Sequence, residues 1–352
     1  MKQRMDIIYP SIQDSSAEGM LDVLISIPFE HLNHSFHLQI PKALYEGAKA
    51  ASKKALIPSG IGDAWLPGYY RSFIEDKKQI PFFTALLKPF RAIRKEQELD
   101  SDRYLELLTA YVQGLPYDRE KTASLDIAPR FPVETAADKK GICSDKSLLL
   151  AAMLSIEGYA CAILHFGPEH HAAVGIPAPD GFDFKKTGYA IIETTVVSYI
   201  GSEPCTPEGV REVKRPKVIP VGNGTKTYSA IRDTAKILAV TRTLAEKLNP
   251  EGTLVSELKR LQASIAEQTE SLRSVKAELE SPDISFERDA ELRPEARARV
   301  LTLQQTIRQY NALADEFSDA QKLAAFIHTN RLDRKAVMRG ILANIHNNSN
   351  QK

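Results

Sequence analysis

Three side chains in the middle of the chain belong to types that together carry out thiol chemistry. Cys143 is followed along the chain by His171 and then by Glu193, each in a separate segment. A nucleophilic thiol needs a base that takes its proton, and an imidazole base needs an acceptor that fixes its tautomer and orientation. This order of residue types predicts a nucleophile, a general base and an orienting carboxylate.

The segment around Cys143 predicts a buried helix that begins at the cysteine. Gly141 and the polar pair Ser144-Asp145 are typical of entry into a helix, residues 148–154 are an unbroken apolar run, and Gly158 is typical of the exit. A helix that is apolar all round is buried in a domain core. Free N–H groups and the positive end of the helix dipole would favour a thiolate at this position. The same position also suits a small buried residue without catalytic function.

The other two residues fall on segments that follow this helix. Residues 160–166, 171–176 and 189–195 have strand-like composition, with prolines and a polar insertion between them. His171 then begins the second strand and Glu193 lies on the third. Adjacent strands of one sheet can present both side chains to the end of a helix packed across them.

Several segments in this part of the chain resemble the transglutaminase-like superfamily, which shares the papain-like cysteine–histidine–carboxylate arrangement, and most of all its prokaryotic branch. The segments are AYVQGLPYDRE (110–120), RFPVETAADKKGICSDKSLLLAAMLSIEGY (130–159), HAAVGI (171–176), GYAIIETT (188–195) and YIGSEP (199–204). The resemblance implies an α+β fold in which a buried helix bearing the cysteine packs on an antiparallel sheet. It also implies Cys143 as nucleophile, His171 as general base and Glu193 as orienting carboxylate. One departure is Ile142, where the family often has an acid.

Neighbouring residues compete for these roles. His170 stands beside His171, but the match of HAAVGI to the family favours His171, and alternation along a strand turns His170 to the opposite face. Asp145 is expected to accept hydrogen bonds from free N–H groups of the first helical turn rather than to take part in the chemistry. Cys161 is expected in the core within a strand, and Cys205 in a proline-flanked loop without a base.

Composition places the chain among soluble globular proteins. Its 352 residues are enough for two or three domains, 43% are hydrophobic and 26% charged, and the net charge of +1 gives no general attraction to nucleic acid or membrane. No apolar run reaches the roughly 18 residues that a spanning helix needs, and the first residues lack the apolar centre of a signal peptide. Three cysteines do not form a disulfide framework, which favours the cytoplasm.

We expect three regions: residues 1–100 with a β-hairpin and helices, residues 101–222 as the catalytic domain, and residues 225–352 as a helical region. The hairpin is predicted at 20–41, and its histidines (His31, His34 and His37) are expected to face solvent rather than a metal. Residues 43–54 are predicted to be a helix, and the Gly- and Pro-rich residues 56–70 a loop.

Residues 254–317 are expected to form an antiparallel coiled-coil hairpin. Apolar residues recur there at alternating steps of four and three on both sides of a Ser281-Pro282-Asp283 break, with Pro294 expected in the first turn of the second helix. The first series is Leu254, Leu258, Leu261, Ile265, Gln268, Leu272, Val275 and Leu279, and the second is Ala296, Val300, Leu303, Ile307, Tyr310, Ala314 and Phe317.

Three functions remain open from the sequence. The leading one is thiol-dependent hydrolysis or acyl transfer at a peptide or carboxamide bond of a protein or peptide substrate, without a cofactor or metal. Hydrolysis is favoured over cross-linking because water is always present. The alternative is an inactive scaffold that binds a partner, or itself, through the hairpin. A metal site built from Cys143, His171 and Glu193 is the least favoured, because paired-ligand spacing is absent.

Overall fold

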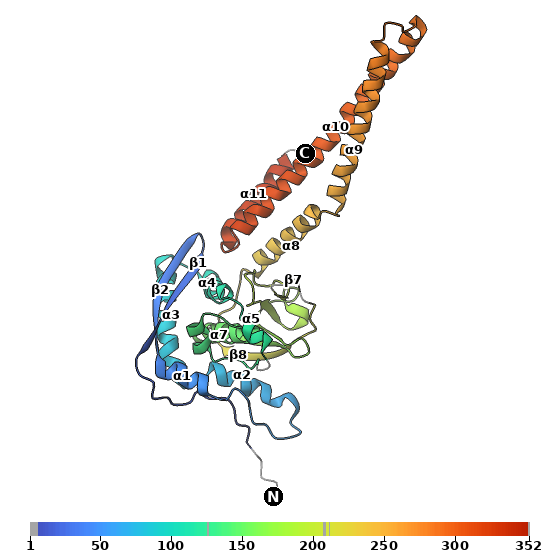
Figure 1. Ribbon diagram of the computed structural model, residues 1–352. Coiled ribbons are helices and arrows are strands. Elements are labelled where there is room, and N and C mark those ends of the chain that lie inside the picture. The colour runs from blue at the N-terminus through green and yellow to red at the C-terminus, as the bar shows by residue number, and fades with distance from the viewer. Residues whose placement is uncertain (1–5, 125–126, 207–208, 211, 351–352) are drawn as a thin grey trace. The chain divides into compact units, whose positions relative to one another are not determined.

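The computed structural model describes residues 6–124, 127–206, 209–210 and 212–350. It is an α+β protein with antiparallel sheets and a helical C-terminal region, as expected from the sequence (Figure 1). Contacts divide the chain into two compact units. Unit 1 comprises residues 1–236 and 330–334, and unit 2 comprises residues 237–329 and 335–352. Residues 1–100 therefore belong to the same unit as the expected catalytic region. Among the helices of the described residues, none is long and apolar enough to cross a membrane.

Unit 1 contains a four-stranded antiparallel sheet with the order β5-β4-β3-β8. Its strands are β3 (Ala160–Phe166), β4 (His171–Pro177), β5 (Tyr189–Ile192) and β8 (Lys217–Asn223). In the register of the central pair, Phe166 lies opposite His171 and Ala162 opposite Gly175. β3 and β4 are almost wholly buried, which explains their continuous apolar sequences. A two-stranded sheet, β6 (Cys205–Thr206) and β7 (Gly209–Val210), completes this part.

Helix α7 (Cys143–Ile156) packs against β3, β4 and β8, as predicted for the helix that bears the cysteine. All its side chains from Leu148 to Leu154 have no solvent exposure. A helix is buried on every side only when other elements cover the faces that the sheet leaves open. Helices α2, α4 and α6 do this, so α7 lies between the sheet and a layer of helices.

The N-terminal part of unit 1 supplies a hairpin and most of this helical layer. Strands β1 (Met20–Phe29) and β2 (Leu32–Pro41) form the predicted hairpin, with alternating buried side chains. The helices are α1 (Lys42–Ala50), α2 (Leu66–Ile74), α3 (Ile80–Glu96), α4 (Ser101–Gly114), α5 (Arg119–Ala123) and α6 (Pro132–Asp138). Short 3-10 turns lie at Gly62–Trp65, Lys77–Gln79 and Phe184–Lys186. His31 and His37 are exposed, and His34 is half-buried beside Gln97.

Three local predictions were wrong in this unit. Residues 66–70 are the start of α2 rather than a loop, because Pro67 occupies a first-turn position where its missing N–H is not needed. The helix predicted at 43–54 ends at Ala50. Glu193 follows β5 instead of lying on it, because its own carboxylate binds the N–H groups of Thr194 and Thr195 and so ends the strand ladder.

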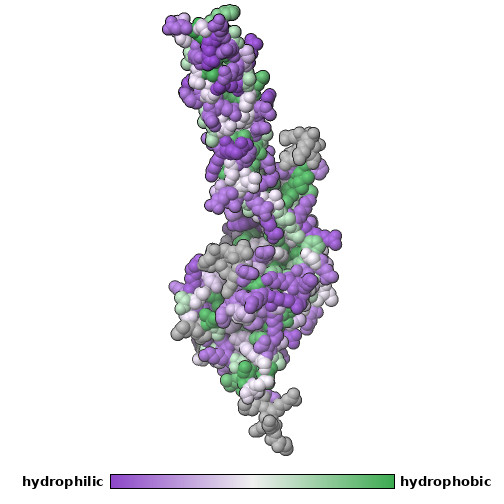
Figure 2. All heavy atoms as spheres, turned by 90° about the vertical axis from the view of Figure 1, so that its right-hand side faces the viewer, coloured by the Kyte–Doolittle hydropathy of each residue, from purple (hydrophilic) through white to green (hydrophobic). Residues whose placement is uncertain are grey.

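Unit 2 is helical and contains the predicted hairpin. Its helices are α9 (Thr253–Leu279), α10 (Phe286–Thr329) and α11 (Arg334–Asn350), and α8 (Ile231–Leu248) enters it from unit 1. α9 and α10 pack along each other in antiparallel directions after the break at residues 280–285 (Figure 1). In the face shown in Figure 2, mostly hydrophilic side chains cover this hairpin, with apolar ones scattered among them. The pattern is that of two helices sharing a narrow seam.

The seam follows the predicted heptads in α9 but not throughout α10. Every predicted seam residue of α9 is buried or half-buried. In α10, Thr306 is buried while Val300 and Ile307 are exposed, so the second predicted series was partly wrong. A polar pair occupies the seam here, because the side chains of Thr306 and Gln268 hydrogen-bond across it at 3.2 Å. The helix also begins at Phe286, which leaves Pro294 inside it rather than in its first turn.

Candidate active site

The N-terminus of α7 is held by the carboxylate of Asp145. Asp145 Oδ2 accepts the N–H of Ile142 at 3.0 Å, and Oδ1 accepts the N–H of Arg130 at 2.8 Å. The Lys121 ammonium contacts both oxygens, at 2.7 and 2.9 Å. Asp145 is wholly buried. It therefore has the structural role expected from the sequence, since it fixes the backbone on which Cys143 stands and neutralises a buried lysine.

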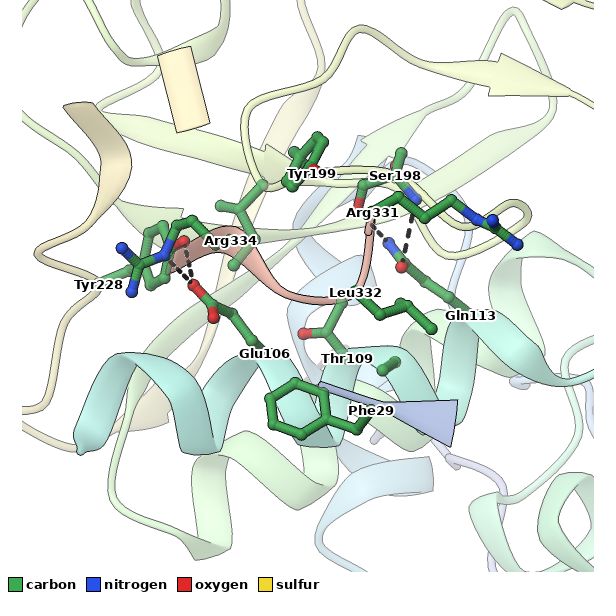
Figure 3. A pocket seen from close by; sticks show the side chains of 12 residues that line it. Phe29, Glu106, Thr109, Gln113, Ser198, Tyr199, Tyr228, Arg331, Leu332 and Arg334 are labelled. Atoms are coloured by element: carbon green, nitrogen blue, oxygen red, sulfur yellow. Dashed lines mark hydrogen bonds and ion pairs between the residues drawn. The ribbon is translucent and has the colours of Figure 1, made fainter. Parts of the chain in front are cut away.

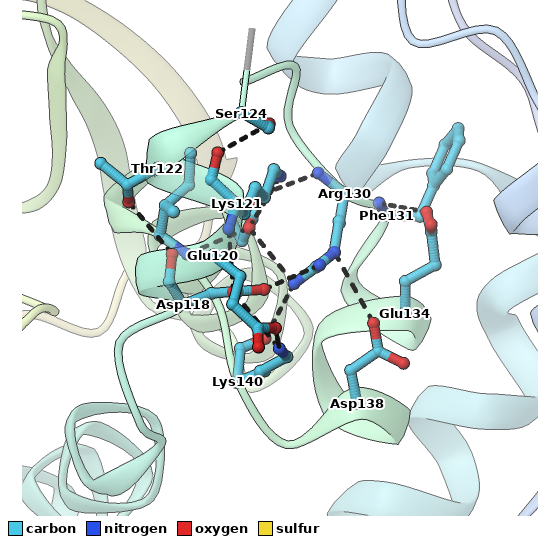
Figure 4. A network of polar contacts seen from close by, with 12 residues as sticks. Asp118, Glu120, Lys121, Thr122, Ser124, Arg130, Phe131, Glu134, Asp138 and Lys140 are labelled. Carbon is cyan, nitrogen blue, oxygen red and sulfur yellow. Dashed lines mark hydrogen bonds and ion pairs between the residues drawn. The ribbon is translucent and has the colours of Figure 1, made fainter. Parts of the chain in front are cut away.

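A network of charges surrounds this anchor. Arg130 and Lys140 are directed at Asp118, with nitrogen–oxygen distances of 2.8 and 3.3 Å (Figure 4). Burial raises the pKa of Asp118, but the Lys121 N–H, Arg130 and Lys140 outweigh this and lower the pKa below its ordinary value. Because the carboxylates and cations alternate, the network ties α5, α6 and the start of α7 together.

Cys143 is the first residue of α7 and lies beside His171 at the start of β4. The interaction between the two side chains raises the pKa of His171, and Cys143 Sγ is 3.9 Å from the carbonyl oxygen of His170. Cys143 retains 7% of its surface, whereas Cys161, in the core as predicted, retains 1%. A backbone N–H in the first turn of a helix has no intrahelical acceptor. The N–H of Cys143 can therefore donate a hydrogen bond to the oxyanion that forms when the sulfur attacks a carbonyl carbon.

His171 is held from the other side by Glu193. Its Nε2 is 2.9 Å from Glu193 Oε2, which leaves the Nδ1 nitrogen for the thiol. Burial lowers the pKa of His171, but hydrogen bonds with Cys143 and Glu193, together with their charges, outweigh this and raise the pKa to about 9. The imidazole is thus protonated at neutral pH, which is the state that pairs with a thiolate.

Glu193 is an ionised carboxylate in a wholly buried position. Its Oε1 accepts the N–H groups of Thr194 and Thr195 at 2.8 and 2.9 Å and the Thr195 hydroxyl at 2.8 Å. Burial raises the pKa of Glu193, but these bonds and the imidazole lower it below the ordinary value. A buried carboxylate is stable only when its oxygens have such donors.

The backbone of Glu193 is fixed from α4 by Gln113. The Gln113 Nε2 donates to the carbonyl oxygens of Glu193 at 2.7 Å and of Ser198 at 3.1 Å, and its Oε1 accepts the Ser198 N–H at 3.3 Å. The bonds with Ser198 are drawn in Figure 3. Gln113 and Ser198 also line a small cavity of about 40 Å³. On the opposite side of the cavity, Arg334 Nε donates to Glu106 Oε1 at 2.6 Å and so holds segment 330–334 against α4.

The structure brings all three predicted residues together, while the side chains of His170 and Cys161 lie outside this group. His170 is exposed, in a turn with a positive φ of 49°, while the neighbouring His171 is buried. Burial raises the pKa of Cys161 to about 12 and so keeps its thiol protonated. The backbone of Cys205 lies in β6, and its side chain is outside the described residues. No group of three or more His, Cys, Asp or Glu residues within the described ranges is arranged to hold a metal ion.

Three residues near the site were not predicted to belong to it. Gln113 was a polar residue on an apolar helix, and Lys146 a lysine beside the apolar run of α7, so each gave a signal in the sequence. Tyr70 gave none. Its hydroxyl lies 2.8 Å from His165 Nδ1, and burial, Tyr69 and the charge of Cys143 all raise its pKa. Tyr70 therefore lies within electrostatic range of the Cys143 side chain.

No family model matches the chain, and neither the curated proteins nor the solved structures yield a match. The chemistry of the site is therefore inferred from its own geometry.

Proposed function

We propose that this protein is a cysteine hydrolase or acyltransferase with a papain- and transglutaminase-like core, which acts on a peptide or carboxamide bond of a protein or peptide substrate. Cys143 is the nucleophile, His171 the general acid and base, and Glu193 the acceptor that orients the imidazole. The reducing conditions that such a thiol requires favour the cytoplasm.

One observation carries this proposal: His171 interacts with Cys143, which raises the pKa of the imidazole, and its Nε2 lies 2.9 Å from the buried, ionised carboxylate of Glu193. Burying a charged carboxylate costs free energy that a hydrophobic side chain would not. A scaffold needs no such group behind a histidine. A nucleophilic thiol does, because the carboxylate stabilises the imidazolium that accompanies a thiolate.

The reaction follows from these positions. The Cys143 sulfur attacks the carbonyl carbon, and the resulting oxyanion accepts the N–H of Cys143. His171 then gives its proton to the leaving nitrogen as the carbon–nitrogen bond breaks, which releases an amine or ammonia and leaves a thioester on the enzyme. In the second half, His171 takes a proton from water, and the hydroxide displaces the sulfur to give a carboxylic acid. An amine in place of water would give a new amide.

Labelling with a thiol-directed probe tests the proposal. The wild type should react with iodoacetamide at Cys143, identified by mass spectrometry, while Cys161 stays unlabelled as an internal control. Cys143→Ala should abolish the labelling, and His171→Ala should slow it by about a hundredfold. Equal labelling of wild type and His171→Ala would overturn the proposal. In a separate reaction, unlabelled enzyme is mixed with a peptide substrate and hydroxylamine. Hydroxylamine attacks the thioester of an acyl-enzyme and displaces the Cys143 thiolate, so a hydroxamate of the substrate's acyl group is expected.

A second function, binding of a partner or of another copy, is favoured by exposed apolar side chains on the hairpin of unit 2. Phe286, at the start of α10, is 88% exposed and Leu301 is 64% exposed. Light scattering of the full chain, with and without the paired change Phe286→Ser and Leu301→Ser, tests this function. A mass that is monomeric for both proteins would exclude self-association and leave a foreign partner.

A further inference from the structure

Lys146 is a buried lysine of α7 for which the described residues provide no ion-pair partner. Lys146 lies one turn after Cys143 in α7 and has no solvent exposure. Within the described part of the chain, its ammonium donates to backbone carbonyl oxygens only, those of Gln113 at 3.2 Å and Leu115 at 2.7 Å. Burying an ammonium ion is costly unless negative charge lies nearby. A leucine or methionine would fill the same volume without this cost, so the charge itself calls for an explanation.

Two sources of negative potential meet at Lys146. The first is the C-terminal end of α4, where the last carbonyl groups carry the negative end of the helix dipole. The second is Glu193, whose charge raises the pKa of Lys146 although burial, the larger effect, brings that pKa down to about 8. Interaction between two charges is reciprocal, so an ammonium that is stabilised by Glu193 also stabilises the Glu193 carboxylate.

Gln113 connects the lysine to the triad physically. Its backbone carbonyl accepts from Lys146, and its side-chain amide donates to the backbone of Glu193. A single residue of α4 therefore receives the ammonium on one side and fixes the carboxylate-bearing segment on the other. This path leads from Lys146 through Gln113 to Glu193, which binds His171.

We propose that Lys146 is a positioning residue, the buried counter-charge that keeps Glu193 ionised behind His171 and sets the pH range in which the triad is reactive, while Gln113 fixes the position of Glu193. This inference rests on the proposed function. The elements packed on α7 present further titratable side chains: Tyr70 of α2, Tyr111 of α4, Glu134 of α6, and Cys161 and His165 of β3. The charges that act on His171 are those of Cys143 and Glu193.

The sign of the effect distinguishes this role from a purely structural one. Removing a positive charge makes neighbouring groups easier to protonate, so Lys146→Met should move the acid limb of the pH profile of Cys143 labelling upward by about one pH unit, whereas the alkaline limb, where Lys146 is already largely neutral, should change little. On the acid limb, this is about a tenfold slower reaction at a given pH. Gln113→Leu removes the support of Glu193 but not the charge, so it should move the alkaline limb downward, toward the range of an ordinary histidine.

The experiment compares the pH dependence of iodoacetamide labelling in full-length wild type, Lys146→Met, Lys146→Gln and Gln113→Leu. Lys146→Gln keeps a donor for the α4 carbonyls without the charge, and it replaces the methionine variant if that variant does not fold. Lys226→Met is the matched control, because this ammonium donates to the carbonyl of Glu157 at the opposite end of α7, and it should leave the profile unchanged.

Titration of the Glu193 carboxylate by NMR gives a readout that does not require a reactive thiol. Lys146 is charged throughout the pH range in which a carboxylate titrates, so its charge-free variants should raise the pKa of Glu193, and a pKa that is unchanged or lower would overturn the inference. A wild-type Cys143 that does not label, with the shift of Glu193 still present, would overturn the proposed function instead. The two failures are therefore distinguishable.

Discussion

The two units of this protein place their polar groups in opposite ways. In unit 1, carboxylates such as Asp145 and Glu193 are wholly buried, and each has donors from several elements. In unit 2, the charged pairs are on the surface, many of them between residues three or four apart, such as Glu257 with Arg260, and the interior is a narrow seam. Buried charges demand a unique arrangement, because a misplaced partner leaves a charge without compensation. Surface ion pairs on a helix do not require a unique arrangement, because water compensates either charge when the pair is broken.

This contrast predicts where a single substitution matters, and the largest effect is expected on the chemistry. His171→Ala should lower turnover by a hundredfold or more, because it removes the group that pairs with the thiol. His170→Ala, at the adjacent exposed position, should change turnover less than twofold. The release of amine from a peptide substrate measures both. Similar losses in the two variants would contradict the assignment of His171.

The buried anchor of α7 should give the largest effect on stability. Asp145→Asn leaves the Lys121 ammonium, which is nearly buried, without its counter-charge, and should lower the free energy of unfolding by about 3–5 kcal/mol. Glu257→Gln, which breaks a surface pair of α9, should have no measurable effect. Urea denaturation of the two variants tests the contrast, and a small cost at Asp145 would show that the buried network contributes little.

Truncating an apolar side chain should also cost more stability in unit 1 than in unit 2. Leu149→Ala creates a cavity inside α7, which is packed on all sides, and should cost about 3 kcal/mol. Leu301→Ala, on the exposed side of α10, should change the unfolding free energy by less than about 0.5 kcal/mol. Thermal unfolding of both variants gives the comparison. A large loss for Leu301→Ala would reveal that a partner chain covers this position.

The pH dependence of stability should come from unit 1. The pKa of His171 is raised from its ordinary 6.5 to about 9, so its stabilising contribution is complete below pH 6.5 and is lost as the pH rises through 9. The pKa of Lys146 is lowered to about 8, so deprotonation of this lysine makes the free energy of unfolding rise with pH, but only above pH 8. Urea denaturation between pH 6.5 and 8 should therefore show falling stability in the wild type. The fall should be absent in His171→Gln, and an equal fall in both proteins would assign it to another group.

The smallest effect is expected in the seam of unit 2. Thr306→Val removes the hydroxyl that pairs with Gln268 and should cost about 1 kcal/mol, because the amide keeps Ser264 but loses its partner across the seam. Adding Gln268→Leu should restore stability or increase it, since two apolar residues then face each other. Denaturation midpoints of the single and double variants measure this. A double variant that is less stable than either single one would contradict the polar pairing.

Much of the fold was predictable where the signal is local. The apolar run after Cys143, the alternation in residues 20–41 and the heptads of residues 254–279 each determine which face of an element avoids water, and neighbours in the sequence suffice to show it. The same logic failed at residues 66–70, where Gly and Pro suggested a loop although Pro67 opens a helix. It also failed at Thr306, whose burial depends on Gln268 in the other helix.

The sequence by itself determined the residue types of the triad, the buried helix that begins at Cys143, and the division between a mixed α+β part and a helical part. Only the tertiary structure decided that His171 bonds to Glu193 and interacts with Cys143, that Gln113 fixes the glutamate, and that Lys146 is buried and donates to the backbone of Gln113. The catalytic role of these residues stays a prediction. The physical reason is the distance along the sequence over which each effect acts. The face of an element that avoids water can be predicted from neighbouring residues, whereas the compensation of a buried charge depends on which distant segments meet.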